Sequence, residues 1–355
     1  MSIERQMKLS IIIPLYNNKK YIGNCINSCL NQGIDEKDYE IIVVNDASTD
    51  SGDKEVNRYI EKNKNIHLIN HEINKGPEQS RRTGLLKARG EYVFFVDSDD
   101  WLTPNILYAF VENANKNGYD LVCGKRRMVA AIGKLRIFSK TIPLNACGEI
   151  TKPELIDKYW ISFFGQSVIP IFITGILIRK TCIPIECFSA GMRFWEDQYE
   201  MLCTFQNLNK VYYSSELVYN YRLGGMTSSF NKRIYTDHKT LFRLRLNKID
   251  ETGYEKGRYY ACGEMKNVFK EVIKEMIRDN TYSKEETIDF ISEELNDSIW
   301  NDVLIPEYLR KFKNQDFTNS LVAKDANAIY NISENESKQN GLKRLRHRIW
   351  NSVFR

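Results

Sequence analysis

The first hundred residues alternate two patterns of apolar positions. Segments of strand length that are rich in apolar residues occur four times, and they are separated by segments whose apolar residues recur at helical spacing. The apolar-rich segments predict strands at residues 8–16, 39–48, 65–72 and 91–96. The segments between them predict helices at residues 19–32, 49–62 and 77–90. This βαβαβαβ order implies a parallel sheet with helices on both faces, because crossover connections are right-handed.

Polar and acidic residues follow each predicted strand. Ligands of such sheets bind beyond the carboxyl ends of the strands. These ends fall at residues 14–17, 45–50, 71–76 and 97–100, and we expect them to share one rim. The first turn reads PLYNNKKY and lacks the glycine-rich phosphate fingerprint, so neither a dinucleotide dehydrogenase nor a P-loop kinase is indicated.

The pattern beyond residue 102 predicts further helices and strands, and then a region that is helical only. It indicates helices at 104–118 and near 152–160, a strand at 119–129 with a hairpin partner at 134–140, an isoleucine-rich core strand at 169–180, and a strand pair region at 210–223. From about residue 231 the sequence becomes helical and highly charged. We therefore expect a domain over residues 1–230, a helical extension over 231–335 and a basic helix over 336–355.

Composition narrows the class of protein. The chain has 355 residues, of which 42% are hydrophobic and 27% charged, as in ordinary globular proteins. The net charge of +5 is small for this length and indicates no general binding of nucleic acid. The eight cysteines lack zinc-type spacing, and Cys25 and Cys29 are expected to be buried thiols in a reducing compartment. Because no signal peptide or bilayer-length apolar run is recognisable, we expect a cytoplasmic protein.

The stretch FFVDSDDWL places three carboxylates at the end of an apolar strand. Asp97 and Asp99 alternate with Ser98, and Asp100 follows at once. Buried negative charge of this density is costly unless water, a cation or hydrogen bonds balance it. The stretch is therefore a candidate ligand site.

Five segments resemble family 2 glycosyltransferases of the GT-A fold, in the right order. They are SIIIPLYNNKKYIGNCINSCLNQ, YEIIVVNDASTD, NKGPEQSRRTGLLKARGEYVFFVDSDD, FWEDQYE and YNYRLGGMTSS. The resemblance implies an α/β fold of the GT-A nucleotide-diphospho-sugar transferase type, with a Rossmann-like, mainly parallel sheet and a C-terminal helical extension. It also implies transfer of a sugar, with inversion, from a nucleotide-diphosphate donor to a hydroxyl of a glycan or lipid-linked glycan in surface polysaccharide synthesis. The expected donor is a UDP-sugar.

The resemblance assigns roles to the acidic stretch. It implies that Asp99 binds a divalent cation, Mg²⁺ or Mn²⁺, which neutralises the diphosphate as it leaves. Asp97 and Ser98 are implied to lie near the ribose and diphosphate, and Asp100 is expected to cap the following turn. The alternative is that these residues only solvate the strand end and cap the helix that begins at Pro104.

The nucleotide pocket is implied at the ends of the first two strands. The backbone of Pro14 and Leu15 is expected to bind the edge of the base, Tyr16 to stack on its face, and Asp46 to accept from a ring N–H. The alternatives are that Tyr16 packs in the core and that Asp46 makes an Asx-turn with Ser48.

The segment after the third strand is implied to meet the phosphates. Lys75 and Gly76 belong to the expected donor site, where the glycine permits a close backbone approach, and Arg81 matches a phosphate-binding arginine. Arg82 stands where the family commonly has asparagine, so it either alters local hydrogen bonding or adds a contact. Arg222 is expected either to bind the diphosphate or to form a surface salt bridge, and the glycine loop after it is a candidate lid.

An inverting transferase needs one carboxylate that accepts the proton of the attacking hydroxyl. Asp197 matches the family's base, with Glu196 as the neighbour that orients it. The alternative is that both acids merely begin a helix, where negative side chains are favoured. The intact acidic residues also disfavour a noncatalytic nucleotide-sugar or glycan-binding protein that retains the fold.

The end of the chain is basic and amphipathic. If helical, residues 342–355 place Leu345, Ile349 and Trp350 on one apolar face with Lys343, Arg344 and Arg348 around it. This pattern is typical of a peripheral anchor on anionic lipid, at the inner face of the cytoplasmic membrane. The alternative is that the apolar face docks on the protein itself. The helical extension is a candidate surface for a homodimer.

Overall fold

The computed structural model describes residues 7–132, 135–224, 231–279 and 281–339. The chain forms two compact units, and each is described by itself. The first comprises Met1–Trp160 and Val168–Gly225, and the second comprises Ile161–Ser167 and Met226–Arg355.

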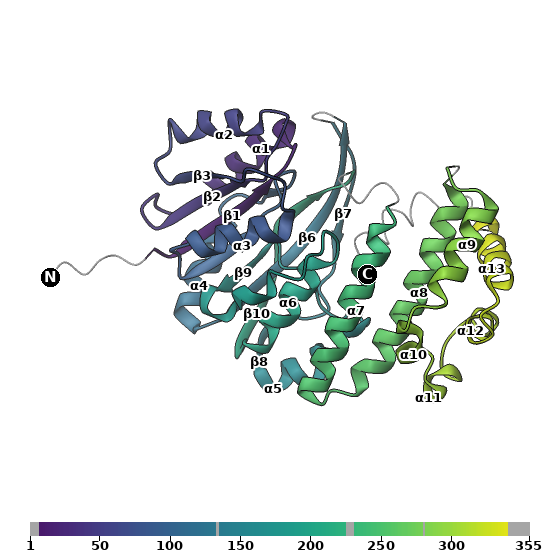
Figure 1. The fold of residues 1–355 in the computed structure, drawn as a ribbon. Coiled ribbons are helices and arrows are strands. Elements are labelled where there is room, and N and C mark those ends of the chain that lie inside the picture. The colour runs from purple at the N-terminus through teal and green to yellow at the C-terminus, as the bar shows by residue number, and fades with distance from the viewer. Residues whose placement is uncertain (1–6, 133–134, 225–230, 280, 340–355) are drawn as a thin grey trace. The chain divides into compact units, whose positions relative to one another are not determined.

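A ten-stranded sheet with helices on its faces makes up the first unit (Figure 1). The strand order is β3-β2-β1-β4-β9-β6-β10-β5, with β7 paired to β6 and β8 paired to β10. The four predicted N-terminal strands are β1 (Leu9–Leu15), β2 (Tyr39–Asn45), β3 (Ile66–Asn70) and β4 (Tyr92–Phe95). They pair in parallel, which confirms the predicted sheet. Their connections are α1 (Lys19–Leu30), α2 (Gly52–Ile60) and α3 (Pro77–Lys87).

Alternate residues of β1 face different helices, as expected of a buried strand. Ile11 and Ile13 pack in one buried cluster with Ile22 and Cys25 of α1. Ile12 points the other way, toward α3, where a Cβ on Gly84 would lie 2.4 Å from the Ile12 Cγ2. The helix therefore packs closely on the sheet because residue 84 has no side chain.

The remaining elements of the first unit complete a mixed sheet. They are β5 (Trp101–Leu102), α4 (Ile106–Asn117), β6 (Leu121–Ile132), β7 (Leu135–Ile142), β8 (Gly148–Thr151), α5 (Lys152–Glu154), η1 (Leu155–Tyr159), β9 (Ile176–Arg179), η3 (Lys180–Cys182), η4 (Ile185–Cys187), α6 (Glu196–Gln206) and β10 (Lys210–Arg222). The short helix η2 (Trp160–Phe164) begins at the last residue before the chain enters the second unit and belongs mainly to that unit. The antiparallel β6–β7 pair confirms the predicted hairpin.

Two strand predictions of this region are wrong in extent. The apolar run at 169–180 forms a strand only over Ile176–Arg179, because Pro170 has no N–H to donate and Gly175 has a φ of +71°. The region at 210–223 is one strand rather than a pair. That strand, β10, pairs in parallel with β6 and antiparallel with β5 and β8, with register shifts between Tyr213 and Tyr219.

The cysteines follow the prediction only in part. Cys25 and Cys29 are buried free thiols, as expected. Cys187 and Cys203 form a disulfide across a separation of 16 residues, which their spacing did not predict. This link joins η4 to α6.

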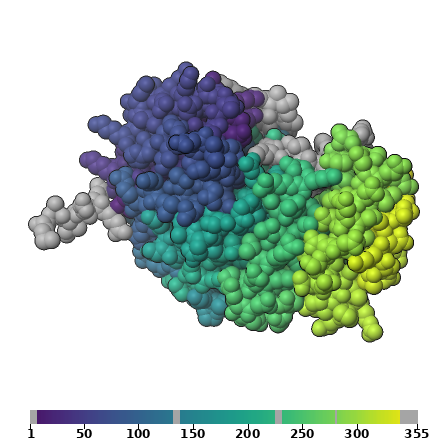
Figure 2. All heavy atoms as spheres, viewed as in Figure 1, coloured from purple at the N-terminus to yellow at the C-terminus, as the bar shows by residue number. Residues whose placement is uncertain are grey.

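The second unit is helical, as predicted. Its helices are α7 (Arg233–Thr252), α8 (Lys256–Arg278), α9 (Lys284–Glu294), α10 (Ile299–Val303), α11 (Pro306–Leu309), α12 (Gln315–Val322) and α13 (Ala326–Gln339). Helix α8 packs on α7, α9, α10 and α13, and the atoms of α13, in yellow, lie against this group in Figure 2. The ring centroids of Phe269 and Trp300 lie 5.0 Å apart in its core.

The membrane predictions fall mainly outside the described residues. Within the described ranges, no helix is both long and apolar enough to cross a bilayer. The predicted basic helix at 336–355 includes residues 340–355, which the structure does not describe.

Candidate active site

The acidic segment after β4 is fixed by hydrogen bonds from other elements. The backbone N–H of Asp97 donates to the hydroxyl of Tyr219 at 3.0 Å. Ser98 is 3% exposed, and its hydroxyl accepts from the side-chain amide of Asn18 at 2.8 Å. These bonds hold the segment at the carboxyl end of β4.

Asp100 ties this segment to β10. Its side chain is 1% exposed, and Oδ1 accepts from the backbone N–H of Arg222 at 2.7 Å. Burial, together with the charges of Asp99 and Asp97, raises the pKa of Asp100 well above its usual range. Its role is therefore structural, but it anchors β10 rather than capping the following turn.

The protein balances the charge of Asp99 only in part, through the charge of Arg222. No salt bridge joins it to another described residue, and burial and the charge of Asp97 raise the pKa of Asp99 to about 6. A divalent cation would supply the missing positive charge, so this carboxylate fits the expected ligand. The described residues contain no cluster of three or more ligand side chains, so phosphate and water would provide the remaining coordination.

Arg81 joins the end of β4 to the start of α6. Its guanidinium is 4% exposed and lies 3.0 Å from the Glu196 Oε1, 3.3 Å from the Glu200 Oε2 and 3.4 Å from the Asp97 Oδ1. The resemblance implied a phosphate contact for Arg81, whereas the structure surrounds it with carboxylates. We call Arg81, Asp97, Glu196 and Glu200 the Arg81 cluster.

The carboxylates of this cluster are strongly perturbed. Burial raises the pKa of Glu196 to about 8 and raises that of Glu200 well above its usual range, although the charge of Arg81 opposes both shifts. One buried guanidinium faces three acids, of which Glu196 and Glu200 are also buried. The cluster therefore retains at least one proton near neutral pH.

Asp197 lies in the first turn of α6. The helix follows Trp195, whose φ of 67° is left-handed and turns the chain into the site. Burial raises the pKa of Asp197, the charges of Arg81 and Arg126 lower it, and the charge of Asp97 raises it. The predicted base thus lies within electrostatic reach of the acidic segment and of two arginines.

Arg126 is a site residue that sequence reasoning missed. It lies on β6, is 8% exposed, and donates to the carbonyl and the hydroxyl of Thr174, the latter at 2.6 Å. Its guanidinium lies 3.4 Å from the ring centroid of Phe172. The only signal in the sequence was a cation within a buried strand.

The nucleotide side of the rim is partly preorganised. Tyr16 is 42% exposed, so its ring is accessible rather than packed in the core. Asp46 is buried, and its carboxylate accepts from the backbone N–H groups of Lys75 at 2.8 Å and Gly76 at 2.7 Å. Gly76 has a φ of +90°, which favours glycine. Asp46 thus holds the loop that carries Lys75.

His71 and Asn45 complete this support. The His71 Nδ1 lies 2.8 Å from the Asp46 Oδ1, and its Nε2 lies 2.9 Å from the Thr83 hydroxyl. The alternative of an Asx-turn between Asp46 and Ser48 is wrong, because the Ser48 N–H donates to the Asn45 Oδ1 at 3.1 Å.

The other predicted residues occupy defined places. The Leu15 carbonyl already accepts from the Asp46 N–H at 2.8 Å, and Pro14 pairs in register with Val44. The Nε of Arg82 is buried and has no hydrogen-bond partner among the described residues.

Arg222 braces the acidic segment instead of forming a surface salt bridge. Its Nε donates to the Asp99 carbonyl at 2.8 Å, and its guanidinium lies 4.3 Å from the ring centroid of Tyr21 and 4.9 Å from that of Trp101. Residues 225–230 of the predicted lid lie outside the described residues.

Comparisons with known proteins found a family match and several relatives. Residues 10–168 match the family described as Glycosyl transferase family 2. The chain is 31% identical over 276 residues to the poly(ribitol-phosphate) β-N-acetylglucosaminyltransferase TarP of Staphylococcus aureus, covering 77% of this chain and 74% of that protein. It is 30% identical over 217 residues to a poly(ribitol-phosphate) β-glucosyltransferase of Bacillus spizizenii, covering 61% of this chain. It spans only 32% of that relative's length and 60% of that of a second, the uncharacterised glycosyltransferase EpsJ of Bacillus subtilis.

A solved structure shares the fold. Residues 1–349 of Staphylococcus aureus TarS, crystallised with UDP-GlcNAc, superpose with a TM-score of 0.68 at 21% identity, covering 94% of this chain and 92% of that one. This likeness confirms the predicted GT-A fold with its C-terminal helical region.

Proposed function

The chain belongs to glycosyltransferase family 2, and from this premise we propose that it transfers a sugar from a UDP-linked donor to a hydroxyl of a surface polysaccharide, with inversion. The observation that carries the proposal is the Arg81 cluster, which brings the acidic end of β4 to the Glu196–Asp197 pair of α6. A polyol-phosphate chain is the acceptor class we favour, because two of the similar proteins act on poly(ribitol phosphate).

Each residue of the site has its own role in the reaction. Asp197 accepts the proton of the acceptor hydroxyl. At the same time the hydroxyl oxygen of the acceptor bonds to the anomeric carbon of the sugar, and the bond from that carbon to the diphosphate breaks. Glu196, held by Arg81 at 3.0 Å, positions the base, and Tyr16 stacks on the nucleotide base. A divalent cation held by Asp99 would offset the growing charge of the leaving diphosphate.

The test is the variant Asp197→Asn. We expect sugar transfer to fall about a hundredfold or more, because general-base catalysis contributes that much, while UDP binding is retained. Release of the nucleoside diphosphate, UDP or GDP, from a panel of UDP- and GDP-sugars measures the first quantity, and isothermal titration calorimetry with UDP measures the second.

The matched control is Asp157→Asn, at an exposed acid of the same unit, which should transfer normally. Normal transfer by Asp197→Asn would exclude Asp197 as the base. An absence of turnover with every donor, by the unaltered protein, would refute the proposed function.

A further inference from the structure

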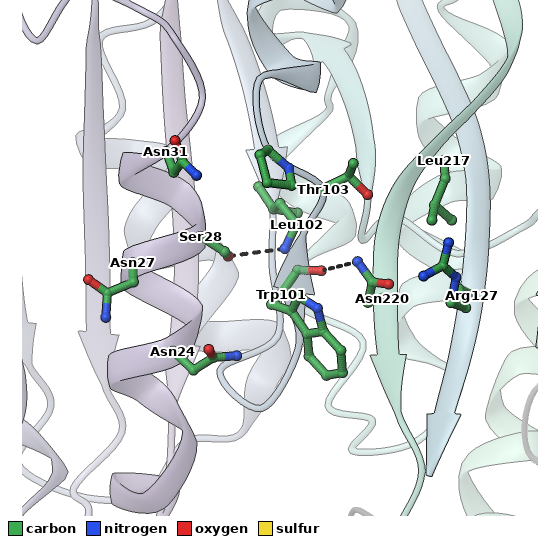
Figure 3. Close-up of a pocket in the computed structure, with 11 residues that line it drawn as sticks. Asn24, Asn27, Ser28, Asn31, Trp101, Leu102, Thr103, Arg127, Leu217 and Asn220 are labelled. Atoms are coloured by element: carbon green, nitrogen blue, oxygen red, sulfur yellow. Dashed lines mark hydrogen bonds between the residues drawn. The ribbon is translucent and has the colours of Figure 1, made fainter. Parts of the chain in front are cut away.

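The first unit contains a cavity that is not lined by any residue of the Arg81 cluster. It has a volume of about 440 Å³ and is bounded by α1, β5, β6 and β10 (Figure 3). Arg127 lines it, whereas the preceding residue, Arg126, belongs to the active site. Since successive residues of a strand point to opposite faces, the cavity lies on the other face of the sheet.

Three strands contribute a row of side chains to the floor of this cavity. Asn220 of β10 pairs with Trp101 of β5 on one side and with Arg127 of β6 on the other. Directly paired residues project from the same face, so the three side chains are neighbours. The Asn220 amide donates to the Trp101 carbonyl at 3.3 Å, which fixes its orientation.

Helix α1 supplies the facing wall. Asn24 and Asn31 are exposed and lie two helical turns apart, hence on one side of the helix. Neither side chain forms a hydrogen bond within the described parts of the chain, and Figure 3 shows Asn24 extending toward Trp101. Asn27 differs, because its amide donates to the Tyr59 hydroxyl at 2.7 Å.

The cavity carries an unbalanced positive charge. Its 11 lining residues include one cation, Arg127, and no acid. Arg127 is half-buried, and its guanidinium has neither a hydrogen bond nor a salt bridge to a described residue. A partly desolvated guanidinium of this kind favours a ligand with a single negative group.

We propose that this cavity binds a polyol-phosphate unit of the acceptor chain, remote from the unit that receives the sugar. Amide groups offer both donors and acceptors to hydroxyls, the Trp101 ring packs against C–H groups, and Arg127 pairs with the phosphodiester. The volume suits a small ligand. The inference rests on the proposed function, which supplies the acceptor.

The covalent chain connects this subsite to the donor site. Trp101 follows Asp99 by two residues, and Arg222 both donates to the Asp99 carbonyl at 2.8 Å and stacks on the Trp101 ring. An acceptor chain seated in the cavity is thereby anchored beside the acidic segment. The subsite should increase affinity for long acceptors more than for short ones.

The probe is a ribitol-phosphate oligomer, titrated by calorimetry without donor. We expect Arg127→Gln to weaken binding about tenfold or more, since a charge-assisted hydrogen bond is lost, and Asn24→Ala to weaken it severalfold. The controls Arg58→Gln and Asn57→Ala change exposed residues of α2 outside the cavity and should bind as the unaltered chain does. Circular dichroism checks that every variant is folded.

Two comparisons decide the outcome. A neutral oligosaccharide of equal length should bind more weakly than the oligomer and should not distinguish Arg127→Gln from the unaltered chain. Equal oligomer affinity of Arg127→Gln and the unaltered chain overturns the proposal.

Turnover of UDP-sugars is measured on the same preparations. If turnover is present and oligomer affinity is unchanged in the variants, the subsite alone fails. If turnover is absent while Arg127→Gln still weakens oligomer binding, the proposed function fails and the subsite stands.

Discussion

Replacing Arg81 by methionine tests the central electrostatic feature of the site. The change keeps the length of the side chain but removes the cation that lies 3.0 Å from Glu196 and 3.3 Å from Glu200. Both glutamates are buried, so neither gains compensation from water. The cost in unfolding free energy should therefore depend on whether these glutamates are protonated.

The magnitude follows from their pKa values. At low pH both glutamates are neutral with or without Arg81, so the variant loses only hydrogen bonds, about 1–3 kcal/mol. At high pH the intact chain retains charged pairs, whereas the variant must bury an uncompensated charge or keep a proton, a loss of about 3–5 kcal/mol.

The sign of the pH dependence can be worked out for each glutamate. The unfolded chain releases these protons near the ordinary glutamate pKa of about 4.3, and the native chain keeps the Glu196 proton up to about pH 8. The native state binds more protons in that window, so stability falls as pH rises, by about 1.4 kcal/mol per pH unit for each group. Loss of Arg81 raises the folded pKa values further, so the variant keeps losing stability above the pH at which the intact chain levels off.

Urea unfolding at about pH 6 and about pH 9.5, followed by tryptophan fluorescence, measures the difference. Trp195, which precedes Glu196, reports on this region. The control Arg58→Met removes an exposed arginine paired with Glu55 and should cost less than about 1 kcal/mol at both pH values. An equal loss at both pH values for Arg81→Met would refute the reasoning.

Two further substitutions test the catalytic assignments. Arg126→Gln removes a charge that lowers the Asp197 pKa, so the acidic limb of the kcat/KM profile should move to higher pH and the rate should fall more at about pH 6 than at about pH 8; an unmoved limb would contradict this role. Asp99→Ala should abolish the dependence of UDP binding on added Mn²⁺, measured by calorimetry with and without a chelator; metal-enhanced binding that survives the change would exclude Asp99 as the ligand.

Local patterns predicted the N-terminal half of the sheet correctly. The four predicted strands form the parallel β3-β2-β1-β4 array. Strands β1, β2 and β4 are almost wholly buried, whereas β3 lies at the edge of the sheet and only its first residue, Ile66, is buried. The prediction was less accurate where periodicity was ambiguous. The apolar run at 169–180 is mostly irregular, and residues 210–222 form one long strand whose partners come from three different parts of the chain.

The sequence by itself determined the order of the strands and helices, the acidic end of β4 and the candidate base, since these depend on neighbouring residues and recognisable motifs. Tertiary structure alone decided what those residues contact. Arg81 contacts Glu196, which lies 115 residues further along the chain, and Asp100 accepts a hydrogen bond from β10. Arg126 and Arg127 project from opposite faces of β6. Ionisation depends on burial and on charges brought together from distant segments, and neither quantity can be deduced from local sequence.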